Sequence, residues 1–534
     1  MDTAFGHFIS AVTKEPLCGL FSSDLPCRCI NFSALLMRIL FTAFWSPLLF
    51  IATGAIAQVK QPAIRADTAI NRLGASYLRS RNLTGLSIGL YDNGITYFYN
   101  FGTTEAGLQR VPTPATIYEI GSISKTFTSL LLAHAVLEKK LKLTDDIRQY
   151  LPGHYPNLTY QGQPIRLVHL ANTTAGLPDN LPDKPEIFKH KDPDSTVYLF
   201  NKLHQHYRKE AFYADLGNVT LTRVPGTQPA HSNVAAELLG YILENVYHTS
   251  YAALVQRYIT GPLRMASTTV AVPASQRPLL AKGHNKRGKV PDLSLADLQA
   301  AGGLHASPAD MVAYLRAQLA ATDPAIRLSH RLTYGNPTTS AIGLNWAIAQ
   351  TADSKRTFSH SGGTYGFASY STFCPALHRG MVLLTNKNDG KTEATLADLA
   401  AAIVDATDGV PAGLQALRLA LQQRGFVQAA AVYARLKQQH PELYLAEDYV
   451  NNWGYSLLRQ GQKQSALELF KLNVQLYPAS ANTYDSLAEV YEATGDGDSA
   501  IQNYRRSLLL NPTNTNATEH LQKLVAAGTK SNGN

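Results

Sequence analysis

Two neighbouring stretches near the start of the chain alternate between apolar and polar residues. Residues 86–91 and 95–99 both have the two-residue period of a half-buried strand, and Asp92-Asn93-Gly94 separates them. Asn and Gly tolerate the left-handed backbone conformation that tight hairpin turns require. The pattern therefore predicts a β-hairpin.

Longer segments show the three-to-four-residue apolar spacing of helices, and they fall in the middle of the chain. This spacing predicts helices over residues 67–81, 122–143, 233–246 and 308–319, and further strands are predicted over residues 343–348, 368–373 and 380–385. Strands at both ends of a region with helices between them predict an α+β fold. We expect one antiparallel sheet made from both ends of the region, flanked by helices, in a domain of residues 58–405.

The end of the chain repeats with a period of 34 residues. Gly, Ala, an aromatic residue and Pro recur in that order, as Gly461, Ala466, Phe470 and Pro478 and again as Gly495, Ala500, Tyr504 and Pro512. The period and the residue types resemble the tetratricopeptide repeat, which is built from pairs of helices. We expect Gly and Ala to let the two helices of a unit approach, and Pro to stop the second helix.

This resemblance implies an all-α domain of tetratricopeptide-like repeats. A less regular copy containing Gly425, Ala430, Tyr433 and Pro441 precedes the two clear ones. We place the repeats at residues 414–527, after a linker at 406–413 and before a tail at 528–534. Repeat stacks offer concave surfaces, so a protein partner is one expectation, and a cap that serves only the first domain is the other.

Residues 37–57 have the order of a secretory signal. Met37 and Arg38 are followed by an apolar stretch and by Ala55-Ile56-Ala57. This order predicts export to a bacterial periplasm or cell envelope, with residues 1–36 an over-extended N-terminus. Ser46-Pro47 interrupts the apolar stretch, which favours cleavage. Membrane contact is expected only if the segment is retained as an anchor.

Composition and charge exclude some classes of function. Hydrophobic residues make up 45% and charged residues 16% of 534 residues, so the chain is not an intrinsically disordered protein. The net charge of +9 is a weak bias over this length, and no run of five like charges occurs. A nucleic-acid partner is therefore not expected.

The first candidate for chemistry is Ser122-Ile123-Ser124-Lys125, at the start of the predicted helix 122–143. Lys125 lies one helical turn after Ser122, so both side chains share a face. A buried ammonium loses its proton more easily and can then take a proton from a neighbouring hydroxyl. The alternative is a helix-capping serine followed by a solvated lysine.

Two further motifs lie far along the chain, His231-Ser232-Asn233 and His360-Ser361-Gly362-Gly363. Supporting segments are residues 170–178 and 301–310. Together they resemble the serine β-lactamase and penicillin-binding-protein superfamily, in particular its class C β-lactamase, D-alanyl-D-alanine carboxypeptidase and esterase branch. The resemblance covers more than 300 residues and implies a hydrolase that needs no metal and no cofactor.

The resemblance also implies roles for individual residues. Ser122 would be the acylated nucleophile, Lys125 would activate it, and Asn233 would orient the substrate and bind Lys125. The segment His360-Ser361-Gly362 would contact the substrate, with His360 supplying a hydrogen bond or, when protonated, a charge. The N–H groups of Ser122 and Gly363 would form the oxyanion hole.

One residue departs from the family pattern, because His231 stands where the second motif usually has Tyr. A histidine titrates near neutral pH without further tuning, so His231 can serve as a catalytic acid or base. The same replacement can also mark a decayed enzyme, or His231 can simply pack before the helix. The leading hypothesis is an exported serine hydrolase that cleaves a D-alanyl peptide, β-lactam or ester through an acyl-enzyme on Ser122. The alternative is a non-catalytic scaffold in which a decayed hydrolase domain and the repeats bind a partner.

Overall fold

The structure is a computed structural model, and it describes residues 61–184, 186–187, 193–204, 206–288, 298–337, 340–351, 353–512 and 514–531. The predicted over-extended N-terminus (1–36) and signal (37–57) lie outside the described residues. Among the helices that are described, none is both long enough and apolar enough to cross a membrane.

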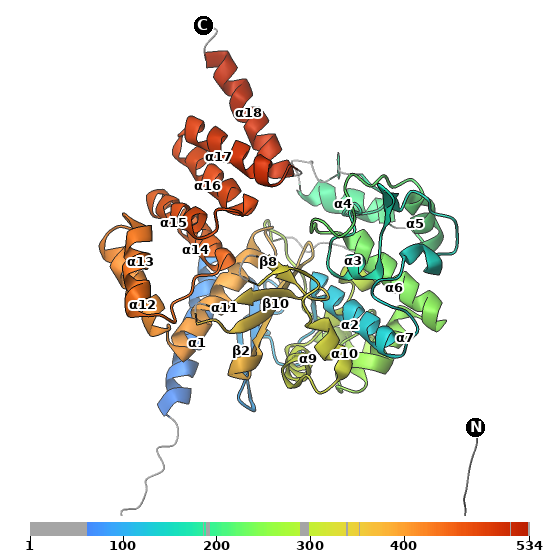
Figure 1. The fold of residues 1–534 in the computed structure, drawn as a ribbon. Coiled ribbons are helices and arrows are strands. Elements are labelled where there is room, and N and C mark those ends of the chain that lie inside the picture. The colour runs from blue at the N-terminus through green and yellow to red at the C-terminus, as the bar shows by residue number, and fades with distance from the viewer. Residues whose placement is uncertain are drawn as a thin grey trace, which may run out of the picture. The chain divides into compact units, whose positions relative to one another are not determined.

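An antiparallel sheet of eight strands forms the centre of the first domain (Figure 1). The strands follow one another in the order β2 (Ile95–Gly102), β1 (Gly85–Asp92), β12 (Arg379–Thr385), β11 (Ala368–Cys374), β10 (Arg356–Gly363), β9 (Ala347–Gln350), β8 (Ser340–Ile342) and β7 (Tyr334–Asn336). The first predicted strand pairs with the last, with Leu86 opposite Thr385. The predicted α+β fold with a sheet made from both ends of the region is therefore confirmed.

Helices cover both faces of this sheet. The helices α1 (Gln61–Ser80) and α11 (Thr392–Asp408) pack on one face, where Ile70, Leu399 and the fully buried Ile88 of β1 share one apolar cluster. The helix α9 (Pro308–Ala320) packs on the other face, where Met311 joins a second and larger cluster. The sheet is therefore buried between two helical layers, as the apolar strands β1 and β12 require.

The larger cluster continues into a helical region beside the sheet. Its main element is α2 (Ser124–Leu137), which is buried almost all round and follows the short turn η1 (Gly121–Ile123). The other elements here are α3 (Leu167–Ala171), α4 (Pro193–His204), α5 (Lys209–Leu216), α6 (Asn233–Tyr247), α7 (Tyr251–Val255), η4 (Gln256–Thr260), α8 (Gln299–Gly302) and α10 (Pro324–Ser329). Short elements lie along the same part of the chain: β3 (Tyr118–Glu119), η2 (Ile147–Tyr150), β4 (Thr159–Tyr160), β5 (Gln163–Pro164), η5 (Ala274–Leu279) and β6 (His305–Ala306). Another short element, η6 (Pro375–Leu377), connects β11 to β12.

Three predicted elements have clearly different bounds in the structure. The helix expected over residues 67–81 already begins at Gln61. The helix expected over residues 122–143 ends at Leu137, because Lys139 turns to a positive φ of 59°. The strand expected over residues 343–348 begins only at Ala347, because Asn345 has a φ of 57° and makes a turn. The side chain of Asn345 donates a hydrogen bond to Ser129 on α2, which ties this turn to the helix that follows Ser122.

The C-terminal region is all-helical. Its helices are α12 (Ala412–Gln423), α13 (Ala429–Gln439), α14 (Glu447–Arg459), α15 (Lys463–Leu476), α16 (Ala481–Thr494), α17 (Gly497–Leu510) and α18 (Thr515–Ser531). Of the predicted linker 406–413, residues 409–411 lie between helices. The two clear repeat copies each span the end of one helix and the next helix, which is consistent with helical repeats.

The repeat glycines have another role than the one expected. Gly461 and Gly495 have φ values of 79° and 87°, and a Cβ added to either would meet nothing within 4 Å. These glycines therefore serve the turn and not close helix approach. Gly454 is the glycine that lets helices α14 and α15 pack closely, because a Cβ added there would lie 2.8 Å from the ring of Phe470.

Candidate active site

Ser122 lies in a turn that is pressed against strand β10. Gly121, the residue before it, has a φ of 52°, and a Cβ there would lie 2.6 Å from the backbone nitrogen of Gly363. Only glycine combines this backbone conformation with this contact. Ser124 tightens the same turn by donating a hydrogen bond to the carbonyl of Gly121 at 2.7 Å. The serine is thereby fixed between the first turn of α2 and the end of β10.

Lys125 lies directly beneath Ser122 and is buried. Its Nζ donates hydrogen bonds of 2.8 Å to Ser122 Oγ, to Asn233 Oδ1 and to the carbonyl of Ala301. Burial lowers the pKa of Lys125 to about 8, against the opposing effect of the charges of Asp179, Glu237 and Glu393. A substantial share of this amine is therefore neutral in mildly alkaline solution, and a neutral amine at 2.8 Å can take the proton of Ser122.

Asn233 reaches this group from the start of α6. Ser232 caps that helix by accepting a hydrogen bond from the N–H of Ala235 at 3.0 Å. Asn233 accepts from Lys125 through Oδ1, and its Nδ2 donates to Asn180 Oδ1 at 3.0 Å. Both ends of the amide are used, so its orientation is fixed and its oxygen faces Lys125.

His231 pairs with a carboxylate that the sequence did not single out. Its Nδ1 lies 2.6 Å from Asp179 Oδ1, and its side chain is 58% exposed. Burial raises the pKa of Asp179, but the hydrogen bond and charge of His231 outweigh this effect and leave that pKa below its ordinary value. The ionised Asp179 holds the proton on Nδ1, so the other ring nitrogen, Nε2, is left as the basic one.

His360 lies on β10 and is not among the residues that line the cavity described below. Burial lowers the pKa of His360 to about 3, and the nearby charge of Lys125 acts in the same direction. Its Nδ1 lies 2.5 Å from the carbonyl of Ser361. At neutral pH the ring is uncharged, which corrects the expectation that His360 can supply a positive charge to the substrate.

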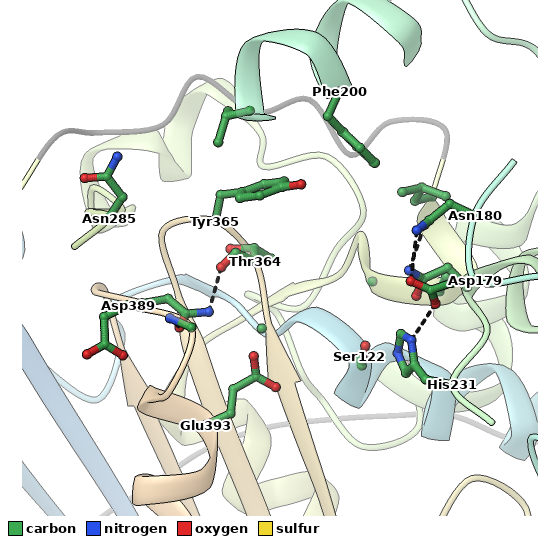
Figure 2. A pocket seen from close by; sticks show the side chains of 18 of the residues that line it. Ser122, Asp179, Asn180, Phe200, His231, Asn285, Thr364, Tyr365, Asp389 and Glu393 are labelled. Carbon is green, nitrogen blue, oxygen red and sulfur yellow. Dashed lines mark hydrogen bonds and ion pairs between the residues drawn. The ribbon is translucent and has the colours of Figure 1, made fainter. Parts of the chain in front are cut away.

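The site opens into one cavity of about 470 Å³ (Figure 2). Four of the predicted residues line it: Ser122, His231, Asn233 and Gly363. Lys125, His360, Ser361 and Gly362 do not. The cavity meets β10 at its end, at Gly363, and continues to Thr364 and Tyr365. The contact of His360, Ser361 and Gly362 with the substrate stays a prediction.

Gly362 on β10 is packed tightly against the turn that carries Ser122. A Cβ there would overlap the carbonyl oxygen of Ile120 and would lie 3.0 Å from the backbone nitrogen of Ser122. The backbone of β10 therefore closes against the serine turn at this point. This contact brings Ser122 and Gly363, the two residues of the predicted oxyanion hole, to the same end of the cavity.

Several residues that line the cavity could not be identified from the sequence. Asp179 and Asn180 directly follow the supporting segment 170–178, and that adjacency was the one available signal. Phe200 and Glu393 belong to helices α4 and α11 and have no motif around them. Among the described residues, no three His, Cys, Asp or Glu side chains gather in a way that could hold a metal ion.

The buried carboxyl of Glu237 positions Ala301, whose carbonyl accepts a hydrogen bond from Lys125. Its Oε2 accepts hydrogen bonds from the N–H groups of Ala300 and Ala301, at 2.9 and 3.2 Å. The carbonyl of Ala301 in turn accepts from Lys125. Glu237 is thus a positioning residue that holds the α8 turn against the lysine.

We predict that Glu237 makes the protein less stable in alkaline solution. Burial raises the pKa of Glu237 to about 8 from an ordinary value of 4.5. The folded state therefore holds the proton more tightly than the unfolded state, and this stabilisation is present below pH 4.5 and is lost as the pH rises through 8. The melting temperature of Glu237→Gln should fall less than that of the wild type as the pH rises between these values. Parallel curves would contradict the prediction.

A serine in the turn before α2, a buried lysine in the first turn of α2 and an asparagine at the start of α6 meet beside an antiparallel sheet. This arrangement is that of a serine hydrolase. A family model described as Beta-lactamase matches residues 66–406. The chain belongs to this family, as the sequence motifs predicted. It is a serine hydrolase of the β-lactamase-related superfamily.

Individual relatives agree with this assignment. A β-lactamase of Pseudomonas fluorescens is 28% identical over 368 residues, which cover 62% of this chain and 96% of the relative. The D-alanyl-D-alanine-carboxypeptidase/endopeptidase AmpH of Escherichia coli is 24% identical, over 66% of this chain and 91% of that protein. Among solved structures, a β-lactamase/D-alanine carboxypeptidase from Yersinia pestis superposes with a TM-score of 0.54 at 25% identity, covering 64% of this chain and 99% of that one.

Proposed function

We propose that the protein hydrolyses ester or amide bonds through an acyl-enzyme on Ser122. The observation that carries this proposal is the hydrogen bond of 2.8 Å between Lys125 Nζ and Ser122 Oγ at the floor of the cavity. The burial of Lys125, which lowers the pKa of this amine to about 8, fits it for the role of a base. A solvated lysine on a surface helix would have neither property.

The proposed reaction has two halves. Neutral Lys125 takes the hydroxyl proton while Ser122 Oγ bonds to the carbonyl carbon, and the oxygen that becomes negative is stabilised by the N–H groups of Ser122 and Gly363. The bond to the leaving group then breaks, and the leaving group receives a proton. Water attacks the acyl-enzyme in the second half and releases the acid and free Ser122.

In the first half, Lys125 passes the proton that it took from Ser122 to the leaving group. We assign the proton transfers of the second half to His231, whose Nε2 takes a proton from the attacking water and returns it to Ser122 Oγ. His231 lines the cavity, and Asp179 leaves its Nε2 as the basic nitrogen. The expected result for His231→Ala is a fall in kcat of about 10²–10⁴, the usual contribution of a general acid or base. A His231→Tyr variant that gains turnover over the wild type would instead support the decayed-enzyme alternative. Steady-state kinetics with p-nitrophenyl acetate measures both variants.

For the substrate we favour a D-alanyl peptide or an ester over a β-lactam. The two named relatives are a β-lactamase and a D-alanyl-D-alanine carboxypeptidase. The family to which this chain is similar usually has a Lys-Thr-Gly motif where this chain has His360-Ser361-Gly362. Because His360 is uncharged at neutral pH, this position offers no fixed positive charge to the carboxylate of a β-lactam. We also propose export, supported by the signal-like order of residues 37–57, and a protein partner for the C-terminal helices.

Covalent labelling tests the proposed function. A fluorophosphonate probe should label the wild-type protein, and peptide mapping should place the label on Ser122. Ser122→Ala should lose the label, whereas Ser80→Ala, which changes an exposed serine at the end of α1, serves as the control and should keep it. Labelling of another residue, or none in the wild type, would favour the non-catalytic scaffold. Nitrocefin, p-nitrophenyl esters and D-alanyl-D-alanine peptides then rank the substrates.

A further inference from the structure

A carboxylate lies beside the expected oxyanion hole. Glu393, in the first turn of α11, lines the cavity and is in contact with the position that a Cβ on Gly363 would take. In Figure 2 it points up into the cavity, across the floor from Ser122 and His231. A negative charge at this point opposes the negative oxygen that forms during acyl transfer, unless a positive group pairs with it.

The rest of the cavity offers little positive charge to pair with Glu393. Lys125 is engaged by three acceptors, and Asp179 is the partner of His231. The described residues that line the cavity include three carboxylates, those of Asp179, Asp389 and Glu393, but one ammonium, that of Lys286. Burial raises the pKa of Glu393, although the hydrogen bond of Asn388 and the charges of His231 and Lys125 oppose this shift. A cation bound in the cavity would supply the missing counter-charge.

The second carboxylate near Glu393 is already satisfied. Asp389 Oδ1 accepts hydrogen bonds from the N–H of Lys391 at 2.9 Å and from the hydroxyl of Thr392 at 2.8 Å. These contacts fix the turn before α11. Asp389 therefore shares the location and the charge of Glu393 but has a structural use, which makes it a matched control.

The opposite wall is aromatic. Phe200 and Tyr365 meet edge to face with ring centroids 5.9 Å apart, and both line the cavity (Figure 2). This wall offers apolar contact to a substrate. The cavity thus combines an apolar side with an acidic side around the serine.

We propose that the cavity selects acyl substrates with a free amino group close to the carbonyl under attack, and that Glu393 pairs with the ammonium. This inference rests on the proposed function, because it requires the carbonyl oxygen to bind at Ser122 and Gly363. The substrate class is then an amino-acid or peptide ester or amide with an unblocked amine. Substrates that carry a carboxylate at the same place are excluded by repulsion.

Three benzyl esters test the charge preference: those of alanine, N-acetylalanine and N-succinylalanine, each in both enantiomers. Release of benzyl alcohol gives kcat/KM for each. We expect the wild type to prefer the free amine over the acetylated ester by at least about tenfold, and to be slowest with the succinylated ester. Equal rates for the three esters would overturn the inference.

The variants separate a direct contact from a general field. Glu393→Gln should lower the ratio of amine to acetylated ester by about tenfold, while Asp389→Asn should change it by less than about twofold. If Glu393→Gln slows all esters equally and leaves the ratio unchanged, Glu393 has a catalytic or structural role and the inference is wrong.

Hydrolysis of p-nitrophenyl acetate and labelling of Ser122 report on the proposed function alone. If both are present and the charge preference is absent, only this inference fails. If both are absent, the proposed function fails and the inference fails with it.

Discussion

Replacement of Lys125 by methionine should lower kcat/KM for p-nitrophenyl acetate by about 10²–10⁴, the range that a general base contributes. Methionine keeps most of the length of the side chain but removes the amine that lies 2.8 Å from Ser122 Oγ. The wild-type rate should rise as the pH increases through about 8, because Lys125 must lose its proton to act as a base. The variant should lack this rise. Rate–pH profiles of both proteins measure the effect.

The control for this experiment is Lys142→Met, which changes an exposed lysine beyond the end of α2. It should keep the wild-type profile. A Lys125→Met protein that is folded and retains more than about a tenth of the wild-type rate would contradict the assignment of Lys125 as the base. Thermal unfolding checks the fold, because the carbonyl of Ala301 and the side chain of Asn233 lose a donor in this variant.

Replacement of Gly362 by alanine should remove most activity through a single methyl group. The added Cβ would overlap the carbonyl of Ile120, lie 2.5 Å from Ser369 Oγ and 3.0 Å from the nitrogen of Ser122. The serine turn must then move away from β10, which separates the two N–H groups of the oxyanion hole. We expect kcat to fall by about 10²–10³. Overpacking should lower the free energy of unfolding by about 1–3 kcal/mol.

Gly497→Ala is the control for the methyl group itself, since a Cβ at Gly497 would meet nothing within 4 Å. It should leave activity and unfolding close to wild type. The comparison of kcat with thermal unfolding separates the two effects in Gly362→Ala. Full activity in that variant would mean that the contact between β10 and the serine turn does not shape the oxyanion hole.

Part of the site could be predicted because its signals are local in sequence. Ser122 and Lys125 lie one helical turn apart, and Asn233 opens a helix that its neighbour Ser232 caps. Both patterns can be read without knowledge of the fold. The sheet was predictable for a similar reason, because alternating runs such as the β1–β2 hairpin have a short period and a clear turn.

The remainder depends on contacts between distant segments. Nothing around Glu393 indicates that helix α11 brings it beside Gly363, and the pairing of His231 with Asp179 joins residues 52 positions apart. His360 shows the opposite error. Its motif suggested a positive charge for the substrate, but burial and the nearby charge of Lys125 keep the ring uncharged at neutral pH. Burial and charge at such positions follow from the packed structure and not from residue type.

The pairing of β1 with β12 also governs when the domain can assemble. The hydroxyl of Thr385 donates a hydrogen bond to the carbonyl of Gly85, a residue 300 positions earlier in the chain. During synthesis the emerging chain must therefore wait for its last strand before the sheet can close, with apolar β1 lacking its inner neighbour in the meantime. A message cut short before this strand yields a polypeptide that carries all three catalytic motifs but lacks the strand that joins β1 to β11.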